Sequence, residues 1–326
     1  MRLFVTGGAG FIGSHFIRHW LKGHPNDTVI NYDALTYAGH TETVADLLDN
    51  PHYRFVAGDI RDEQKVGDLI AESDIVVHFA AESHVDRSII SSKPFVQTNI
   101  EGTLVLLEAA KNAPTRPRFH HVSTDEVFGS LNPSDPKFSE STPYDPRSPY
   151  SASKASSDHL VRAYYYTYGL PITISNCSNN YGAYQLPEKL IPLCITNILE
   201  GKPLPLYGRG ENIRDWIYVL DHVKGIEAAI ERGTIGETYC LGGNNELSNI
   251  EIARMICKEL GVNEDVITYV ADRPGHDFRY AIDSSRAEHD LGWKPELNFK
   301  QGLHETVAWY RDNRWWWEPI KVGIAL

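Results

Sequence analysis

The chain has few cysteines, no long apolar run and no excess of positive charge. Its four cysteines, spread over 326 residues, form no Cys-x-x-Cys pair, which argues against a disulfide framework or a zinc site and favours buried free thiols. No run of about 18 apolar residues occurs and no signal-peptide pattern is present, so we expect a cytoplasmic protein that does not span a membrane. The net charge of −12 gives no overall positive field for nucleic acid, and an anionic ligand would need a local basic site.

Short β-branched runs alternate with amphipathic stretches in the first half of the chain. We predict strands at residues 3–6, 28–32, 53–56, 75–79, 119–123 and 172–175, with helices between most of them. This alternation predicts an α/β fold in which helices cover both faces of a doubly wound parallel sheet.

The composition and the spacing of the predicted elements change after residue 186. Prolines cluster there, and helices predicted at 221–232 and 248–260 are separated by short strands and glycine-rich turns. We therefore expect a first domain at 1–186, to which residues 219–240 return, and a smaller mixed α/β lobe formed mainly by 187–326.

A glycine-rich turn, Gly7-Gly8-Ala9-Gly10-Phe11-Ile12-Gly13, joins the first predicted strand to a helical pattern. Glycines here allow a tight turn and a close approach of the backbone to a pyrophosphate, and the helix start supplies N–H groups for its charge. Asp33 follows at the end of the second strand, where a carboxylate accepts hydrogen bonds from ribose hydroxyls and repels a 2′-phosphate. The pattern predicts a Rossmann-type site for NAD rather than NADP.

A tyrosine and a lysine mark a second site. Ser148-Pro149 predicts a helix start, because serine caps helices and proline is accepted at the first helical position. Tyr150 and Lys154, four residues apart, then share one helix face. A tyrosine with a pKa of about 10 is a poor base at neutral pH, and lowering that pKa by about three units needs roughly 4 kcal/mol, which a nearby ammonium and a nicotinamide cation can supply.

With these two motifs the chain resembles the extended short-chain dehydrogenase/reductase family. A narrower similarity, to the dTDP-glucose 4,6-dehydratases of that family, extends from about Arg2 to about Trp317. The segments that carry it are Ala80-Ala81-Glu82-Ser83-His84-Val85-Asp86-Arg87-Ser88, Ser123-Thr124-Asp125-Glu126-Val127, Asn179-Asn180-Tyr181-Gly182, Pro187-Glu188-Lys189-Leu190-Ile191-Pro192 and Asp272-Arg273-Pro274-Gly275-His276-Asp277.

The resemblance implies a reaction in three stages on dTDP-glucose: oxidation at C4 by tightly held NAD, loss of water across C5 and C6, and return of hydride to C6. Tyr150 would take the C4 hydroxyl proton, Lys154 would hold the nicotinamide ribose and lower the Tyr150 pKa, and Thr124 would hydrogen-bond the oxygen at C4. Glu126 would remove the C5 proton while Asp125 protonates the departing C6 hydroxyl. The product would be dTDP-4-keto-6-deoxyglucose, and no metal is implied.

The resemblance also assigns binding positions. Those for the cofactor are Gly7, Gly10, Phe11, Ile12, Gly13, Asp33, Ala34, Leu35, Thr36, Asp59, Ile60, Phe79, Ala80, Ala81, Ser83, Thr98, Tyr150, Lys154 and Asn180. Those for the nucleotide-diphosphate hexose are Ser83, Arg87, Thr124, Asn179, Lys189, Leu190, Pro205, Tyr207, Arg214, Asn249, Arg273 and His276. Arg214 and Arg273 are expected to clamp the diphosphate, because a guanidinium fork fits phosphate oxygens.

The adjacent acids Asp125 and Glu126 favour a dehydratase over an epimerase. Epimerisation at C4 needs one acid/base group, whereas dehydration needs two more, and neighbouring carboxyl groups can divide that work if their environments separate their pKa values. The alternatives are a C4 epimerase or decarboxylase on the same scaffold, a dehydratase acting on a UDP sugar, and an NAD-binding regulator without activity. The choice between dTDP and UDP stays open.

Three residues depart from the family pattern: Phe128 where tyrosine is usual, Asn176 where arginine is frequent, and Ala183 in place of a proline. We expect these to affect substrate fit and the loop near residue 180 rather than proton transfer. Trp315-Trp316-Trp317 is expected to serve packing or lobe docking, and His120-His121 to be structural.

We also expect a homodimer. The predicted helices at about 94–112 and 150–168 carry apolar residues beyond one core stripe, and the resemblance implies that two copies pair these helices. The residues concerned are Leu104, Leu106, Leu107, Tyr164, Tyr165 and Tyr166.

Overall fold

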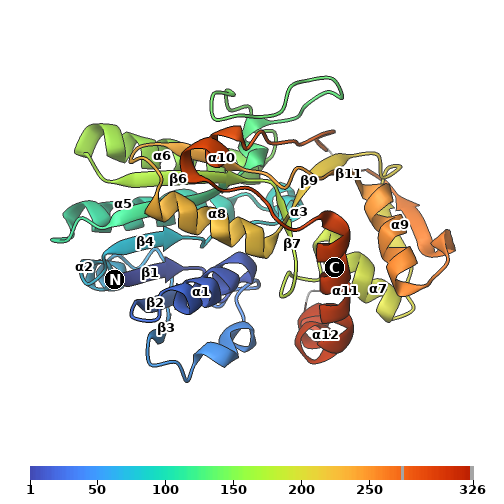
Figure 1. The fold of residues 1–326 in the computed structure, drawn as a ribbon, viewed down its shortest axis with the longest axis horizontal. Coiled ribbons are helices and arrows are strands. Elements are labelled where there is room, and N and C mark those ends of the chain that lie inside the picture. The colour runs from blue at the N-terminus through green and yellow to red at the C-terminus, as the bar shows by residue number, and fades with distance from the viewer. Residues whose placement is uncertain (273–274, 324–326) are drawn as a thin grey trace.

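A seven-stranded sheet forms the centre of the molecule, and each neighbouring pair of its strands is parallel (Figure 1). The computed structural model describes residues 1–272 and 275–323. The strand order is β10-β6-β5-β4-β1-β2-β3, so the direction of winding reverses between β1 and β4. These strands are β1 (Arg2–Thr6), β2 (Thr28–Asp33), β3 (Tyr53–Ala57), β4 (Ile75–His78), β5 (Arg118–Thr124), β6 (Ile172–Cys177) and β10 (Thr238–Leu241).

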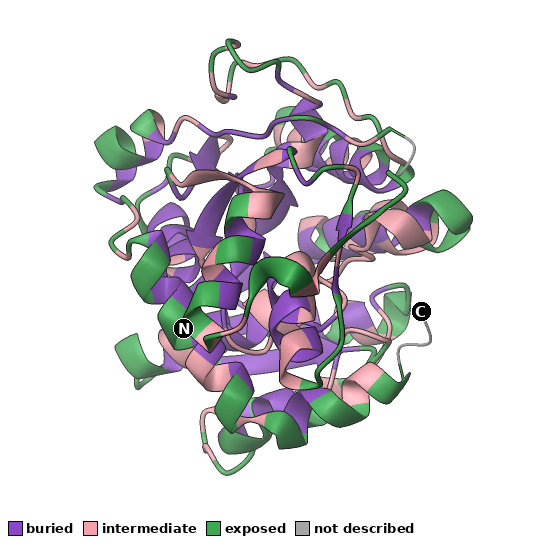
Figure 2. Ribbon diagram, turned by 90° about the vertical axis from the view of Figure 1, so that its right-hand side faces the viewer, coloured by how far each residue is buried: buried purple, intermediate pink, exposed green. Residues whose placement is uncertain are grey.

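Helices cover both faces of this sheet, and Figure 2 shows the buried strands between helices with exposed outer sides. On one face lie α1 (Phe11–Gly23), α8 (Val219–Glu231) and α10 (Ser285–Leu291), and on the other α2 (Glu63–Ala71), α5 (Thr103–Asn112) and α6 (Pro149–Tyr168). Leu3 and Val5 of β1 pack in the first of these cores and Phe4 in the second, because successive strand side chains point to opposite faces. The predicted α/β fold is confirmed, and the six predicted strands end within two residues of the expected positions.

A smaller lobe lies at one end of the large sheet (Figure 1). It contains the sheets β11-β9-β7 and β12-β8 and a core of its own. Its elements are β7 (Asn179–Tyr181), α7 (Leu190–Leu199), β8 (Leu204–Tyr207), β9 (Ile213–Tyr218), β11 (Glu246–Ser248), α9 (Asn249–Leu260), η4 (Glu264–Val266), β12 (Ile267–Val270), α11 (Phe299–Asp312) and α12 (Arg314–Gly323).

The tryptophans of α12 pack as expected, with one exception. Trp316 and Trp317 are buried in the core of the smaller lobe, whereas Trp315 is 56% exposed. Trp316 Nε1 also donates to Thr43 Oγ1 at 3.1 Å, in the 3-10 segment η1 (Thr41–Leu47). This tryptophan therefore ties the end of the chain to a segment near its beginning.

The segment predicted as one helix at about 94–112 is helical throughout, but its middle part is a π-helix. A short α4 (Lys93–Phe95) leads into a π-helical segment, η2 (Val96–Gly102), before α5 begins. Within η2, Asn99 accepts from Glu82 N at 2.9 Å, donates to Glu82 O at 3.0 Å and donates to Ser153 Oγ at 2.8 Å. The π turn thus fixes the segment after β4 against α6, and such turns are frequent at functional sites.

The remaining short elements are α3 (Val85–Ile90) and η3 (Asp125–Phe128). The four cysteines are buried free thiols, as the sequence predicted. In the part of the chain that the structure describes, no helix combines the length and apolarity needed to cross a bilayer.

Candidate active site

A cavity of about 320 Å³ lies at the carboxyl ends of the strands, where the direction of winding reverses. Doubly wound sheets bind their ligands at this point. Every predicted cofactor-binding residue lines the cavity except Leu35. Leu35 is 36% exposed with a φ of 50°, and its backbone N–H donates to Asp33 Oδ1 at 2.8 Å.

The turn between β1 and α1 leaves no space for side chains at two of its glycines. A Cβ at Gly7, which has a φ of +73°, would lie 2.6 Å from Ala80 N, and a Cβ at Gly13 would lie 2.4 Å from Gly7 O. A Cβ at Gly10 would have more room, since Gly7 O would lie 3.3 Å away, and Gly10 itself lines the cavity. The turn therefore has no side chains that would cover its backbone at the point where an elongated anionic ligand could approach the start of α1.

Asp33 closes this part of the cavity. Its Oδ2 accepts from Ala9 N at 2.9 Å and its Oδ1 from Leu35 N. Burial raises the pKa of Asp33, and the two backbone hydrogen bonds oppose that shift. The carboxylate is thus fixed by one bond at each oxygen, which leaves acceptor capacity for a pair of vicinal hydroxyls.

The acid pair lies directly after β5. Asp125 is 2% exposed, and its Oδ2 has no hydrogen-bond partner among the described residues. Burial, and then the neighbouring Glu126 carboxylate, raises the pKa of Asp125 well above its usual range. Glu126 is only partly buried, and its backbone N–H donates to Thr124 Oγ1 at 3.2 Å. Two adjacent carboxyl groups therefore differ in environment, with the proton favoured on Asp125.

Helix α6 carries Tyr150 into the same cavity. The helix starts with a capping box in which Ser148 Oγ accepts from Ser151 N at 3.0 Å. Tyr150 is 8% exposed, and burial followed by the Glu126 charge raises its pKa well above the usual value. The lowered pKa expected from the sequence includes the charge of a nicotinamide cation beside Tyr150, so it stays a prediction.

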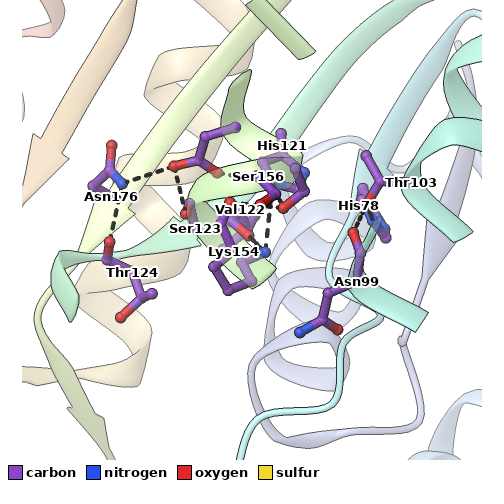
Figure 3. A network of polar contacts seen from close by, with 12 residues as sticks. His78, Asn99, Thr103, His121, Val122, Ser123, Thr124, Lys154, Ser156 and Asn176 are labelled. Carbon is purple, nitrogen blue, oxygen red and sulfur yellow. Dashed lines mark hydrogen bonds and ion pairs between the residues drawn. The ribbon is translucent and has the colours of Figure 1, made fainter. Parts of the chain in front are cut away.

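Lys154 is buried one turn beyond Tyr150. Its Nζ donates to Val122 O at 2.8 Å and lies 3.4 Å from His121 Nε2 (Figure 3). Burial lowers the pKa of Lys154, and the charge of Asp158 opposes that shift. Lys154 thus lines the cavity and also belongs to the polar network that Figure 3 shows.

Four of the predicted substrate-binding residues line the cavity: Ser83, Thr124, Asn179 and Lys189. Lys189 Nζ donates to Ser83 O at 3.0 Å, which joins α7 to the segment after β4. Asn179 Oδ1 is buried and has no partner among the described residues.

The other substrate candidates lie outside the cavity lining or outside the described residues. Seven of them do not line the cavity: Arg87, Leu190, Pro205, Tyr207, Arg214, Asn249 and His276. The eighth, Arg273, is not among the described residues.

Contacts within the protein engage several of these side chains. Arg87 donates to Glu188 Oε2 at 3.0 Å. The Arg214 guanidinium lies 4.2 Å from the centre of the Tyr280 ring and donates to Asp277 O at 3.0 Å. The substrate roles of these residues stay predictions.

Several lining residues were not predicted from the sequence, among them Gly58, Glu82, Cys177 and Gln185. Glu82 lies inside the quoted Ala80 to Ser88 motif and Gly58 directly precedes Asp59, so neighbouring motifs could have indicated both. Cys177 and Gln185 are positioned by the packing of β6 and the loop after β7, for which the sequence has no local signal.

The three departures from the family pattern lie outside the cavity lining. Phe128 stacks on Phe138 with ring centroids 5.2 Å apart. Asn176 Nδ2 donates to Thr124 O at 3.0 Å, and Ala183 O accepts from His15 Nε2 at 2.9 Å. These residues therefore act on the cavity through packing and backbone position.

One group of metal-binding side chains is present in the described residues. His24, Glu227 and Glu231 could hold an ion between α1 and α8. None of the three lines the cavity, and His24 Nε2 already lies 2.9 Å from Glu227 Oε1.

Comparison with known proteins gives consistent results. The model of the GDP-mannose 4,6-dehydratase family matches residues 4–306. The chain is 52% identical to the dTDP-glucose 4,6-dehydratase of Neisseria meningitidis serogroup B, over 99% of this chain and 96% of that protein. It is 51% identical to dTDP-glucose 4,6-dehydratase 1 of Escherichia coli K12, with the same coverage.

Solved structures agree with this. DesIV, a dTDP-glucose 4,6-dehydratase from Streptomyces venezuelae crystallised with NAD, superposes with a TM-score of 0.96 at 50% identity, over 98% of this chain and 100% of that one. UDP-glucose 4-epimerase from Thermotoga maritima has a TM-score of 0.89 at 28% identity, over 96% of this chain and 100% of that one.

The fold and the cavity therefore define an extended short-chain dehydrogenase/reductase that acts on nucleotide sugars. Epimerases share its scaffold, but the dehydratases are far closer in sequence. The chain belongs to the dTDP-glucose 4,6-dehydratase family.

Proposed function

We propose that this enzyme converts dTDP-glucose to dTDP-4-keto-6-deoxyglucose with NAD as a retained cofactor. The observation that carries the proposal is the pairing of buried, proton-holding Asp125 with Glu126 at the cavity that also receives Tyr150 and Lys154. A C4 epimerase does not need this second acid/base pair.

The cofactor part of the cavity fits NAD. The bare turn at Gly7, Gly10 and Gly13 would accept the pyrophosphate, and Asp33 would accept hydrogen bonds from the adenosine ribose. Bound NAD would supply a reversible hydride acceptor for the sugar.

Tyr150 would take the C4 hydroxyl proton as C4 is oxidised, with Thr124 hydrogen-bonded to the same oxygen. Because the protein's own groups raise the Tyr150 pKa, the phenol gives up its proton only when further positive charge lies beside it. Proton transfer from Tyr150 is thereby coupled to binding of the cofactor in the cavity. Lys154 provides the positive charge that is present before the cofactor binds.

Elimination then follows from the environments of the two acids. The ketone at C4 acidifies the C5 proton, which Glu126 removes. Asp125, whose pKa is raised by burial, donates its proton to the C6 hydroxyl as water leaves. Asp125 thus starts in the protonation state that its step requires. The hydride taken from C4 would then return to C6 as C5 regains a proton, which gives the 4-keto-6-deoxy product.

Ser83, Asn179 and Lys189 are proposed to contact the sugar diphosphate, and Arg214 and Arg273 to clamp it. The charge of Arg214 already acts on Asp125, which supports a place near the substrate. A UDP sugar remains the alternative substrate, because the residues that select the base belong to the smaller lobe.

We propose the domain division stated above, 1–186 with 219–240 against mainly 187–326. It is supported by the position of α8 and β10 on the large sheet and by the separate core of the smaller lobe. A cytoplasmic location is supported by the four buried free thiols, which suit a reducing compartment.

A homodimer is proposed through α5 and α6. Leu104 is 40% exposed and Tyr166 is 80% exposed. Three other residues that we expected at the dimer interface pack in the chain's own core instead: Leu106, Leu107 and Tyr164. The proposed interface therefore rests on fewer residues than expected.

Replacing both acids tests the assignment of the elimination step. The wild-type enzyme should form the 4-keto-6-deoxy product from dTDP-glucose. In Asp125→Asn, Glu126→Gln, oxidation should persist and elimination should slow roughly 10²- to 10⁴-fold, so that a 4-keto hexose accumulates. Mass spectrometry of single-turnover samples measures both species, and Tyr150→Phe should form neither. Dehydrated product at the wild-type rate would show that the acids are structural.

Asp33→Ala tests cofactor selection. Loss of a charged hydrogen-bond acceptor should weaken NAD binding about 10- to 100-fold and reduce discrimination against NADP. Dissociation constants for the two dinucleotides, measured by fluorescence quenching, provide the comparison. Wild-type protein that purifies with NADP would contradict this role of Asp33.

Light scattering at micromolar concentration tests the dimer. The wild type should show twice the chain mass of 36.7 kDa, and the double variant Leu104→Asp, Tyr166→Asp should show the monomer mass. Tyr269→Asp is the matched control, because Tyr269 is 58% exposed and lies in β12 of the smaller lobe. A monomeric wild type, or a dimeric double variant, would count against the proposed interface.

A further inference from the structure

A buried carboxylate lies one helical turn beyond Lys154 on α6. Asp158 Oδ2 accepts hydrogen bonds from Ser123 Oγ at 2.9 Å and from Tyr144 OH at 2.8 Å, and Asn176 Nδ2 lies 3.4 Å from the same oxygen. The Asp158 side chain is fully buried. Residues of β5, of β6 and of the loop before α6 therefore hold one oxygen of this carboxylate in place.

The second oxygen of Asp158 faces His121. Its Oδ1 lies 3.1 Å from His121 Nε2, which in turn lies 3.4 Å from Lys154 Nζ. Burial lowers the pKa of His121 to about 4, so the ring is neutral, and the carboxylate favours the tautomer that carries its hydrogen on Nε2. With that tautomer Nε2 faces Asp158 Oδ1 and does not accept from Lys154 Nζ, which donates to Val122 O instead.

We propose that Asp158 is a positioning residue for the reaction: its buried anion, one helical turn beyond Lys154 and in contact with His121, keeps the Lys154 side chain charged and in place beside Tyr150. Asp158 does not line the cavity, so it would act through Lys154 and not on the substrate. This inference rests on the proposed function, and in particular on the role of Lys154 in it.

The other ionisable groups around Lys154 and Asp158 do not supply the same charge. His78 of β4 is neutral because burial lowers its pKa, and Cys177 of β6 stays a thiol because burial raises its pKa to about 12. Arg162 of α6 donates to Tyr144 OH at 3.0 Å, and the Glu126 charge acts on Tyr150. Among the charges of the described residues, that of Asp158 raises the Lys154 pKa most.

Asp158→Asn tests the proposal, because it removes the charge and nearly keeps the shape. Without the anion the Lys154 pKa falls further, so the alkaline limb of the kcat profile should move to lower pH by about one to three units. Above the shifted limb kcat should fall about tenfold per pH unit. KM for dTDP-glucose should stay near the wild-type value, since the side chain does not line the cavity.

Asp221→Asn is the matched control. Asp221 is also a buried carboxylate, on α8, and its Oδ2 accepts from Glu296 N at 3.0 Å and Leu297 N at 2.8 Å away from the cavity lining. This variant should lose thermal stability and keep the wild-type pH profile. An unshifted profile in Asp158→Asn, or an equal shift in Asp221→Asn, would overturn the proposal.

A second variant covers the case in which Asp158→Asn does not fold. Tyr144→Phe removes one hydrogen bond from the carboxylate and keeps its charge, so kcat should fall several-fold with KM unchanged. An unchanged kcat would again contradict the role of Asp158. If the wild type forms no dehydrated product, the failure lies in the proposed function instead.

Discussion

Burial of ionisable side chains at the carboxyl edge of the sheet determines the chemistry of this site. Asp125, Tyr150 and Lys154 are all nearly inaccessible to solvent, and in each case burial is the largest influence on the pKa. It favours the neutral form of every one of them. The site therefore starts with a proton on Asp125 and on Tyr150, and it needs nearby positive charge to release the proton of Tyr150.

The parallel sheet brings these groups together because all its strands end at the same edge. The turn after β1, Asp33 at the end of β2 and the acid pair after β5 are far apart in sequence but line one cavity. Helix α6 completes the site by ordinary helix geometry, with Tyr150 and Lys154 one turn apart. Its capping box fixes where that helix begins, and hence which two residues face the cavity.

Features with a local sequence signal could be predicted, and features set by packing could not. The strands follow from β-branched runs, and the glycine turn follows from its spacing between a strand and a helix. The π turn at Asn99 and the contact of Arg214 with Tyr280 depend on residues distant in the sequence. The rise in the Tyr150 pKa that the protein's own groups cause could not be predicted either, because it depends on burial and on the position of Glu126.

The central claim is that one cavity moves a hydride from C4 to C6 of the same sugar while its acids remove water. The most direct measurement follows deuterium from dTDP-glucose labelled at C4, with mass spectrometry and NMR of the product. The account predicts deuterium at C6 of a 4-keto-6-deoxy sugar and a solvent-derived hydrogen at C5. Deuterium that stays at C4 of an epimer, or that is lost to solvent, would contradict it.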